Sequence, residues 1–232
     1  MKRLNPLTLD QDGCAVLSFD EIRQDEFQEA QEAAFANLKP GENASNVLAR
    51  GIAWGVYAQD RFTWLDRNTY QLPKELNPEE GGRVRRFPLM DKTFLELEDF
   101  QAAMRQCFEA WCFEETSFER AYEVQCSFIR YEPTIAQPAF PSPVMPHQDL
   151  IDGAIIVFNK TGDISGGLSR MYTLAGEPFV ELDLGVGEAL LVKDDRILHQ
   201  VTTIQLEPSP TWRPGQRAYR DIGIVRFQAL GR

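Results

Sequence analysis

Cysteine, long apolar runs and positive charge are all scarce in this sequence. Only four cysteines occur among the 232 residues, and none has CxxC spacing. We expect buried thiols rather than a disulfide framework or a zinc site. No window reaches the roughly 18 apolar residues of a membrane span and no apolar stretch follows the basic start, so we expect a soluble, cytoplasmic protein. The net charge of −11 argues against nucleic-acid binding, which needs a basic face.

Histidine is also scarce, with only His147 and His199. The first lies in the tripeptide His147-Gln148-Asp149. On extended backbone, residues i and i+2 project to the same face, so His147 and Asp149 can reach one ion. His199 follows about fifty residues later in a strand-like run and supplies a third ligand. Two imidazoles and one carboxylate suit Fe(II), Mn(II) or Zn(II), and as a facial triad they are typical of mononuclear non-haem Fe(II) oxygenases.

Arginine gathers near the carboxyl end of this acidic chain. The last twenty residues contain Arg213, Arg217, Arg220, Arg226 and Arg232. The set indicates a small anionic ligand, although we interpret Arg213 and Arg232 as solvated surface residues. A planar guanidinium can pair with a carboxylate through two hydrogen bonds, which a lysine cannot do. Arg220, at the entrance of the last expected strand, is therefore the predicted anchor for an acidic cosubstrate, with Arg217 as its substitute.

The chain is long enough for one substantial core, and we expect a single catalytic domain over residues 1–232. Residues 1–120 are predicted to be a helix-rich flanking region. Ser18 and Glu21 form a capping-box pattern at the start of a helix that runs to about Leu38. A second helix is expected near 93–113, and its large apolar residues at three- and four-residue steps are assigned to the core. They are Phe100, Met104, Phe108 and Trp111.

From residue 121 the apolar pattern becomes that of strands. Strands are expected over residues 122–130, 154–158, 169–173, 188–193, 196–204 and 219–227. Turns with glycine, proline and aspartate separate them, which favours an antiparallel sandwich or barrel over alternating βαβ units. The predicted architecture is therefore helices first, followed by a compact β-barrel over residues 121–232.

A proline-rich segment precedes the first histidine. Pro133, Pro138, Pro141, Pro143 and Pro146 lie within fourteen residues. Repeated prolines hold a loop extended and cannot continue a central strand. Two interpretations stay open: the loop forms a wall or lid of a substrate pocket, or it is a surface connector without a role.

Several blocks of the sequence, in order and spacing, resemble the iron(II)/2-oxoglutarate dioxygenases. Within them the blocks are most similar to the bacterial amino-acid hydroxylases typified by L-isoleucine dioxygenase. The similarity extends over about residues 83–227. The blocks are Gly82–Phe87, His147–Asp149, Gly166–Ser169 with Tyr172, Lys193–Thr202 and Tyr219–Asp221.

The resemblance implies a mainly β fold, a double-stranded β-helix or jelly roll with N-terminal flanking α-helices. It implies that His147, Asp149 and His199 bind Fe(II), that Arg220 binds 2-oxoglutarate, and that dioxygen is the oxidant. The implied reaction hydroxylates an unactivated C–H of a free or carrier-linked L-amino acid, while 2-oxoglutarate becomes succinate and carbon dioxide. The sequence departs from these relatives around the first histidine, where an acidic residue and glycines that are common there are replaced.

An amino-acid substrate needs a cation for its carboxylate and an acid for its ammonium group. Arg130 is the candidate for the first role and Asp152 or Glu132 for the second, although each also fits an ordinary surface charge. Asp194 and Asp195 are interpreted as turn residues rather than ligands. Two other functions stay open: a zinc hydrolase with the same three ligands, and a non-catalytic β-barrel that binds or senses a small molecule. The sequence gives no indication of oligomeric state.

Overall fold

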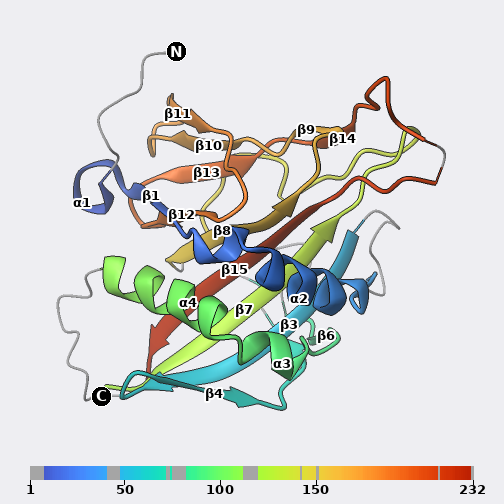
Figure 1. Cartoon of the computed structure of the whole chain (residues 1–232). Helices are drawn as coiled ribbons and strands as arrows, with labels where there is room; N and C mark the ends of the chain where they lie inside the picture. Colours follow the sequence, from blue (N-terminus) through green and yellow to red (C-terminus); the bar gives the residue numbers. More distant parts are fainter. Residues whose placement is uncertain are drawn as a thin grey trace.

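The structure is a computed structural model that describes residues 8–40, 48–71, 74, 82–111, 120–141, 143–149, 152–213 and 215–230. Its large antiparallel sheet is built from β1 (Cys14–Ser18), β2 (Lys39–Pro40), β3 (Leu48–Ala58), β4 (Arg61–Leu65), β7 (Tyr122–Tyr131), β8 (Gly153–Lys160), β12 (Glu188–Val192) and β15 (Arg220–Ala229). The strand order is β1-β12-β8-β15-β7-β3-β2, and β4 pairs with a later stretch of β3 than β2 does. This sheet crosses the whole molecule in Figure 1.

Smaller sheets complete the β structure of the described residues. Their strands are β5 (Thr69–Tyr70), β6 (Arg85–Arg86), β9 (Ile164–Gly166), β10 (Ser169–Tyr172), β11 (Pro178–Leu182), β13 (Leu198–Val201) and β14 (Ile204–Leu206). They form a three-stranded sheet in the order β11-β10-β13 and two pairs, β14-β9 and β5-β6. The three-stranded sheet packs against one face of the large sheet, and together they make the jelly roll that the family resemblance implies.

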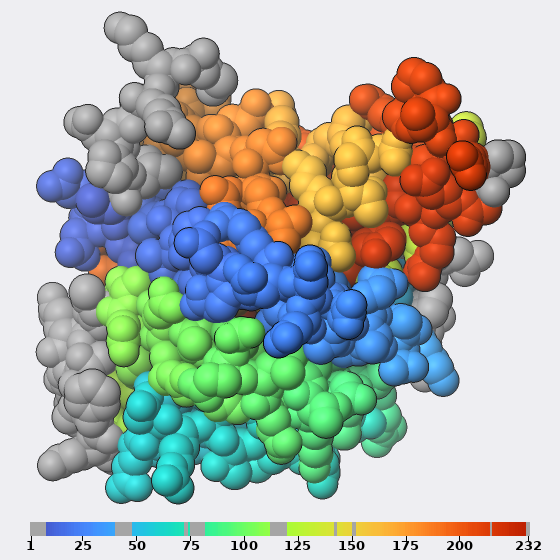
Figure 2. All heavy atoms as spheres, in the orientation of Figure 1, coloured from blue at the N-terminus to red at the C-terminus, as the bar shows by residue number. Residues whose placement is uncertain are grey.

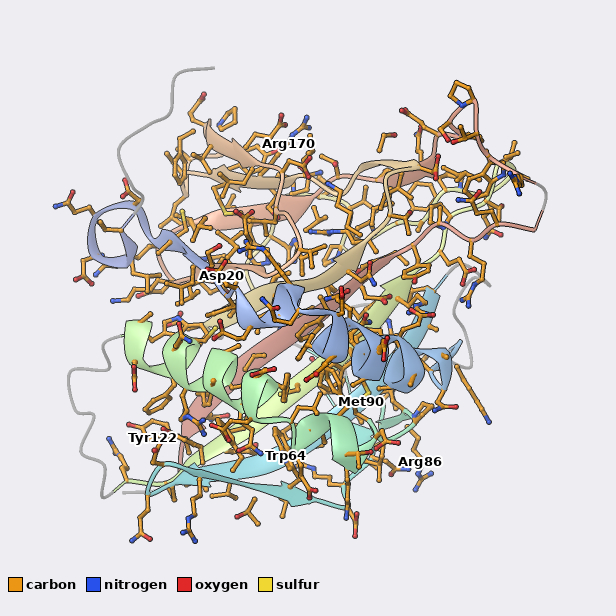
Figure 3. The ribbon with its side chains drawn as sticks, viewed as in Figure 1. Asp20, Trp64, Arg86, Met90, Tyr122 and Arg170 are labelled. Atoms are coloured by element: carbon orange, nitrogen blue, oxygen red, sulfur yellow. The ribbon has the colours of Figure 1, made fainter. Side chains whose placement is uncertain are left out.

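Helices cover the other face of the large sheet. They are α1 (Leu9–Asp12), the 3-10 turn η1 (Glu21–Arg23), α2 (Asp25–Ala36), α3 (Lys92–Leu95) and α4 (Glu98–Ala110). Figure 1 shows α2 and α4 lying across the sheet, and Figure 2 shows their side chains as a continuous layer over it. Trp64 of β4, labelled in Figure 3 between that strand and the helices, donates its indole N–H to the carbonyl oxygen of Leu95 at 3.2 Å. Among the described residues, no helix has the length and apolar character that crossing a membrane requires.

The two faces of β15 belong to two different cores. Val225 and Phe227 pack into the cluster beneath the helices. Ile222, which has the opposite parity, packs into the cluster between the large sheet and the small ones. Because side chains alternate along a strand, Arg220 and Arg226 share the face of Ile222 and project between the sheets.

Three expectations about the helices and the first 120 residues need correction. No capping box forms at Ser18, because this residue ends β1, where it pairs with Glu188; helix α2 begins only at Asp25. The helix expected near 93–113 is split into α3 and α4, although its four apolar residues are buried as predicted. Residues 1–120 hold all the helices of the described residues, as expected, but they do not only flank the β core, because β3 pairs with β7 along ten residues and so joins the large sheet.

The strands expected after residue 121 are confirmed with shifts of at most two residues at their ends. The exception is the strand expected over 196–204, which the structure divides into β13 and β14. The buried thiols are also confirmed where the structure describes them. Cys14, Cys107 and Cys126 are free and buried, and burial raises the pKa of the Cys14 thiol to about 11. Cys112 lies outside the described residues.

A buried ion pair fastens helix α2 to the sheet. The guanidinium of Arg130 on β7 donates Nε to Oδ1 of Asp221 at 2.8 Å and Nη2 to Oδ2 at 2.6 Å. Gln31 of α2 donates to the same carboxylate at 2.7 Å, and Glu32 lies 2.6 Å from Arg130 Nη2. Both Arg130 and Asp221 are almost completely buried. The helix, β7 and β15 therefore share one polar contact inside an apolar layer.

Replacing Asp221 with alanine is expected to lower the free energy of unfolding by about 3–5 kcal/mol, because it leaves the Arg130 charge buried without its main partner. Denaturant unfolding of the purified protein measures this change. Glu181→Ala is the matched control, since it breaks the exposed Arg170–Glu181 pair and is expected to cost less than about 1 kcal/mol. Equal losses in the two variants would contradict the prediction.

Candidate metal centre

The two histidines and Asp149 meet at the edge of the three-stranded sheet. The proline-rich segment ends beside β13. There the backbone N–H of His147 donates to the His199 carbonyl at 3.0 Å, and the N–H of His199 donates to the His147 carbonyl at 2.9 Å. One ligand atom from each of His147, Asp149 and His199 lies within 4.8 Å of the other two. Nε2 of His147 is 3.7 Å from Asp149 Oδ1, and Nε2 of His199 is 3.9 Å from Asp149 Oδ2. These three side chains could hold one metal ion.

The other nitrogen of each imidazole faces an acceptor. Nδ1 of His147 donates to the Met145 carbonyl oxygen at 2.9 Å, and Nδ1 of His199 lies 3.2 Å from Oδ1 of Asp194. The hydrogen bond of His147 favours the tautomer in which its Nε2 carries the lone pair toward the shared point. The His199 contact is at ion-pair distance but does not have hydrogen-bond geometry. Burial, and then the charge of the neighbouring His199, lower the pKa of His147. His147 is thus held as the neutral imidazole that binds metal ions.

Asp194 is the residue of this centre that the sequence interpretation missed. Its carboxylate is buried beside His199, and its backbone is held from two sides. Oδ1 of Asp152 accepts from the Asp194 N–H at 2.9 Å, and the Gln148 side chain donates to the Asp194 carbonyl. A turn aspartate five residues before a ligand histidine is a weak signal, and only the fold shows that it points inward. Asp152, expected to bind a substrate ammonium group, instead supports this turn, and burial raises its pKa.

Asp194→Asn is expected to weaken metal binding by about 10–100-fold, as is typical for the loss of a carboxylate behind a ligand histidine. Titration of the metal-free protein with Fe(II) under nitrogen measures the affinity. Asp195→Asn, the same change at the exposed neighbour, is expected to leave the affinity unchanged. A weaker site in both variants would assign the effect to the turn and not to the Asp194 carboxylate.

Arg220 lies deeper between the sheets and is almost fully buried. Neither Nη1 nor Nη2 has a hydrogen-bond partner within the described part of the chain, and the same is true of the buried Oγ of Ser169. The guanidinium lies against Gly167, where a Cβ atom would come within 3.3 Å of the arginine Cδ and where φ is +70°. Burial lowers the pKa of Arg220 from its usual value. Unpaired donors in a buried place are costly, so they mark a position for an anion.

The remaining predicted residues do not come to this centre. Arg217 is half exposed and pairs with Glu132 through contacts of 2.6 and 2.7 Å. Arg130 projects to the opposite face of the large sheet, toward helix α2, because it has the parity of Phe128 and not of Ile129. The expected substrate contacts of Arg130 and Glu132 therefore need correction: each is engaged in an ion pair away from the metal centre.

The proline-rich segment lies along β13 and β14 next to the histidines. Ala139 exchanges two backbone hydrogen bonds of 2.9 Å with Ile204, and the Gln200 side chain donates to the Val144 carbonyl. Apolar side chains nevertheless stay exposed on it, with Phe140 at 50% and Met145 at 75%. The segment thus brings uncovered apolar surface to the side of His147.

A jelly roll with a cluster of two histidines and one carboxylate between its sheets defines the class of mononuclear metal oxygenases. The model of the 2OG-Fe dioxygenase family matches residues 32–226, and the chain belongs to this family. Enzymes of this family use Fe(II), 2-oxoglutarate and dioxygen. The protein is therefore an oxidoreductase, and the donor set of His147, Asp149 and His199 fits the metal of the family.

Relatives of known activity include amino-acid hydroxylases. The chain is 26% identical over 196 residues to the 3(1)-hydroxy-L-isoleucine 4-dioxygenase of Pantoea ananatis, covering 77% of this chain and 73% of that protein. It is 27% identical over 165 residues to the L-isoleucine-4-hydroxylase of Bacillus thuringiensis, covering 69% of this chain and 65% of that protein.

Solved structures share the fold. The structure of IDO from Bacillus thuringiensis superposes with a TM-score of 0.72 at 18% identity, covering 96% of both chains. A BsmA homologue from Methylobium petroleophilum superposes with a TM-score of 0.78 at 17% identity, covering 97% of this chain and 94% of the other. These similarities support the jelly roll predicted from the sequence.

Proposed function

We propose that the protein hydroxylates an unactivated C–H bond of a free or carrier-linked L-amino acid, with Fe(II), 2-oxoglutarate and dioxygen. The observation that carries this proposal is the buried Arg220, which has no partner among the described residues and lies between the same two sheets as the His147, Asp149 and His199 cluster. The two relatives named above act on isoleucine or a hydroxylated isoleucine, which supports an amino acid as the substrate.

Each residue has a distinct role in this proposal. His147, Asp149 and His199 hold Fe(II), and Asp194 and the Met145 carbonyl fix the orientation of the two imidazoles. Arg220 binds the far carboxylate of 2-oxoglutarate through two hydrogen bonds, and the buried Ser169 hydroxyl of β10, on the three-stranded sheet, is a further donor. When bound, Fe(II) and 2-oxoglutarate supply the oxidising chemistry, and the cosubstrate leaves as succinate and carbon dioxide.

The proline-rich segment is proposed as one wall of the substrate pocket. Its exposed Phe140, Val144 and Met145 lie on the stretch that leads directly to His147. An apolar wall next to the metal suits the side chain of an aliphatic amino acid and excludes water from the reacting carbon.

Two measurements test the proposed function. Anaerobic addition of Fe(II) and 2-oxoglutarate should produce a weak visible charge-transfer band, and succinate release over a panel of free L-amino acids should then be dependent on oxygen. The proposal would be wrong if the metal-loaded protein gave no charge-transfer band and released no succinate. Turnover without oxygen would favour the zinc hydrolase, and tight cosubstrate binding without turnover on any substrate would favour the non-catalytic protein.

A further inference from the structure

Arg226 is a second arginine between the sheets, and the proposed reaction gives it no role. Its side chain is only 11% exposed, and its Nε is buried without a hydrogen-bond partner among the described residues. Nη2 lies 2.5 Å from Oδ2 of Asp149, and Nη1 lies 3.5 Å from the hydroxyl of Tyr70. Within the described ranges, Asp149 is the one carboxylate at ion-pair distance from Arg226. The counter-charge of this arginine is therefore a metal ligand.

Arg226 and Arg220 lie at two different depths of the barrel. They project from the same face of β15 six residues apart, which is roughly 20 Å along a strand. Arg220 is opposite Lys160 at the end of β8, whereas a Cβ on Gly153, at the start of β8, would come within 3.7 Å of the Arg226 side chain. A 2-oxoglutarate whose far carboxylate is held by Arg220 would present its other end to the metal. The Nε of Arg226, which has no hydrogen-bond partner among the described residues, would then be left for another anion. The barrel thus offers two separate positions for anions.

A metal ion bound by His147, Asp149 and His199 would change the charge around Arg226. Such a divalent ion would take up much of the negative charge of the Asp149 carboxylate. The buried Arg226 guanidinium would then have less counter-charge than its burial requires. Tyr70 supplies a neutral donor at the same place. The guanidinium of Arg85 packs 5.1 Å from the Tyr70 ring. A second carboxylate is the ligand that such a position favours.

We propose that Arg226, together with the Tyr70 hydroxyl, binds the free carboxylate of the substrate beside the metal. This inference rests on the proposed function and narrows it. A carboxyl group that is joined to a carrier as a thioester or an amide has no negative charge, so it cannot replace Asp149 as the partner of Arg226. The substrate is therefore an amino acid with a free carboxylate, and carrier-linked amino acids are excluded.

Equilibrium binding to the protein loaded anaerobically with Fe(II) and 2-oxoglutarate tests this inference. The probes are the twenty L-amino acids and, for those that bind, their primary amides; calorimetry and the shift of the charge-transfer band report binding. The amide of a binding amino acid is expected to bind at least about 30-fold more weakly than the acid. Arg226→Gln is expected to weaken the binding of the acid to a similar extent and to leave the binding of the amide nearly unchanged. Without substrate, this variant should still give the charge-transfer band.

Two further variants complete the design. Arg86→Gln changes an arginine of the same β5-β6 pair that points outward (Figure 3), and it should bind both probes like the unmodified protein. Arg226→Lys keeps the charge and is expected to retain part of the preference for the acid. The inference is overturned if no free amino acid binds, if Arg226→Gln keeps the preference, or if it loses the band, because the arginine then only positions Asp149. Failure of the proposed function looks different, since the unmodified protein itself would give no band.

Discussion

Replacing His199 with alanine is expected to weaken Fe(II) binding by more than about 100-fold and to abolish the release of succinate. The loss should exceed that of Asp194→Asn, because a ligand is removed and not merely its support. His147→Ala should behave in the same way, since Nε2 of both imidazoles and the Asp149 carboxylate lie within 4.8 Å of one another. The metal content after dialysis and succinate formation at saturating 2-oxoglutarate measure both effects.

The folded state of these two variants is the necessary control. Each histidine is only partly buried, and its exchange of backbone hydrogen bonds with the other does not involve the side chain. The thermal unfolding midpoint of the metal-free protein should therefore change little. Succinate release that survives in either variant would overturn the assignment of the metal centre, whereas a protein that no longer folds would show itself in the unfolding curve.

The sequence predicts the ligands because their pattern is local or their residue type is rare. His147 and Asp149 are two residues apart on extended backbone, and His199 is the remaining histidine. The strands after residue 121 are also predictable, since their β-branched and aromatic residues alternate with polar ones. β3 escapes prediction because its glycines and alanines have low strand propensity, and its pairing with β7 supplies the stability instead.

The sequence does not predict the roles of residues that depend on the face of the sheet or turn on which the side chain lies. Arg130 and Arg220 have similar sequence surroundings, each at the end of a strand in the β-rich half. They project to opposite faces of the large sheet, so that Arg130 meets Asp221 and Arg220 meets no acid in the described part of the chain. Likewise Asp194 and Asp195 are neighbours in one turn, but only Asp194 is buried against His199. Strand parity and turn geometry decide these roles.

The two buried arginines differ in their partners, which indicates that Arg130 serves stability and Arg220 serves function. Arg130 has Asp221, Glu32 and Gln31 around it, and this network holds helix α2 on the sheet. Arg220 is buried to the same degree without such partners in the described part of the chain, so its charge opposes folding until an anion binds. A residue whose burial costs folding free energy, and which has no partner among the described residues, is typical of a functional site.

Arg220→Met is accordingly expected to change stability and binding in opposite directions. The free energy of unfolding of the protein without metal and 2-oxoglutarate should rise by about 1–4 kcal/mol, because an apolar side chain of similar volume replaces a buried, unpaired charge. The affinity for 2-oxoglutarate should fall at least about 30-fold, since the far carboxylate loses the guanidinium that is proposed to bind it. Denaturant unfolding and anaerobic titration with 2-oxoglutarate measure the two effects.

Arg217→Met separates the two candidate anchors. Arg217 already pairs with Glu132 at the surface, so its loss should change the free energy of unfolding by less than about 1 kcal/mol and leave 2-oxoglutarate binding unchanged. If Arg217→Met weakened the binding of 2-oxoglutarate and Arg220→Met did not, Arg217 would be the residue that binds the cosubstrate. If Arg220→Met lowered both stability and affinity, the arginine would be a structural residue whose partner forms only in the folded protein. A rise in stability together with a loss of affinity is the result that only an anion-binding Arg220 explains.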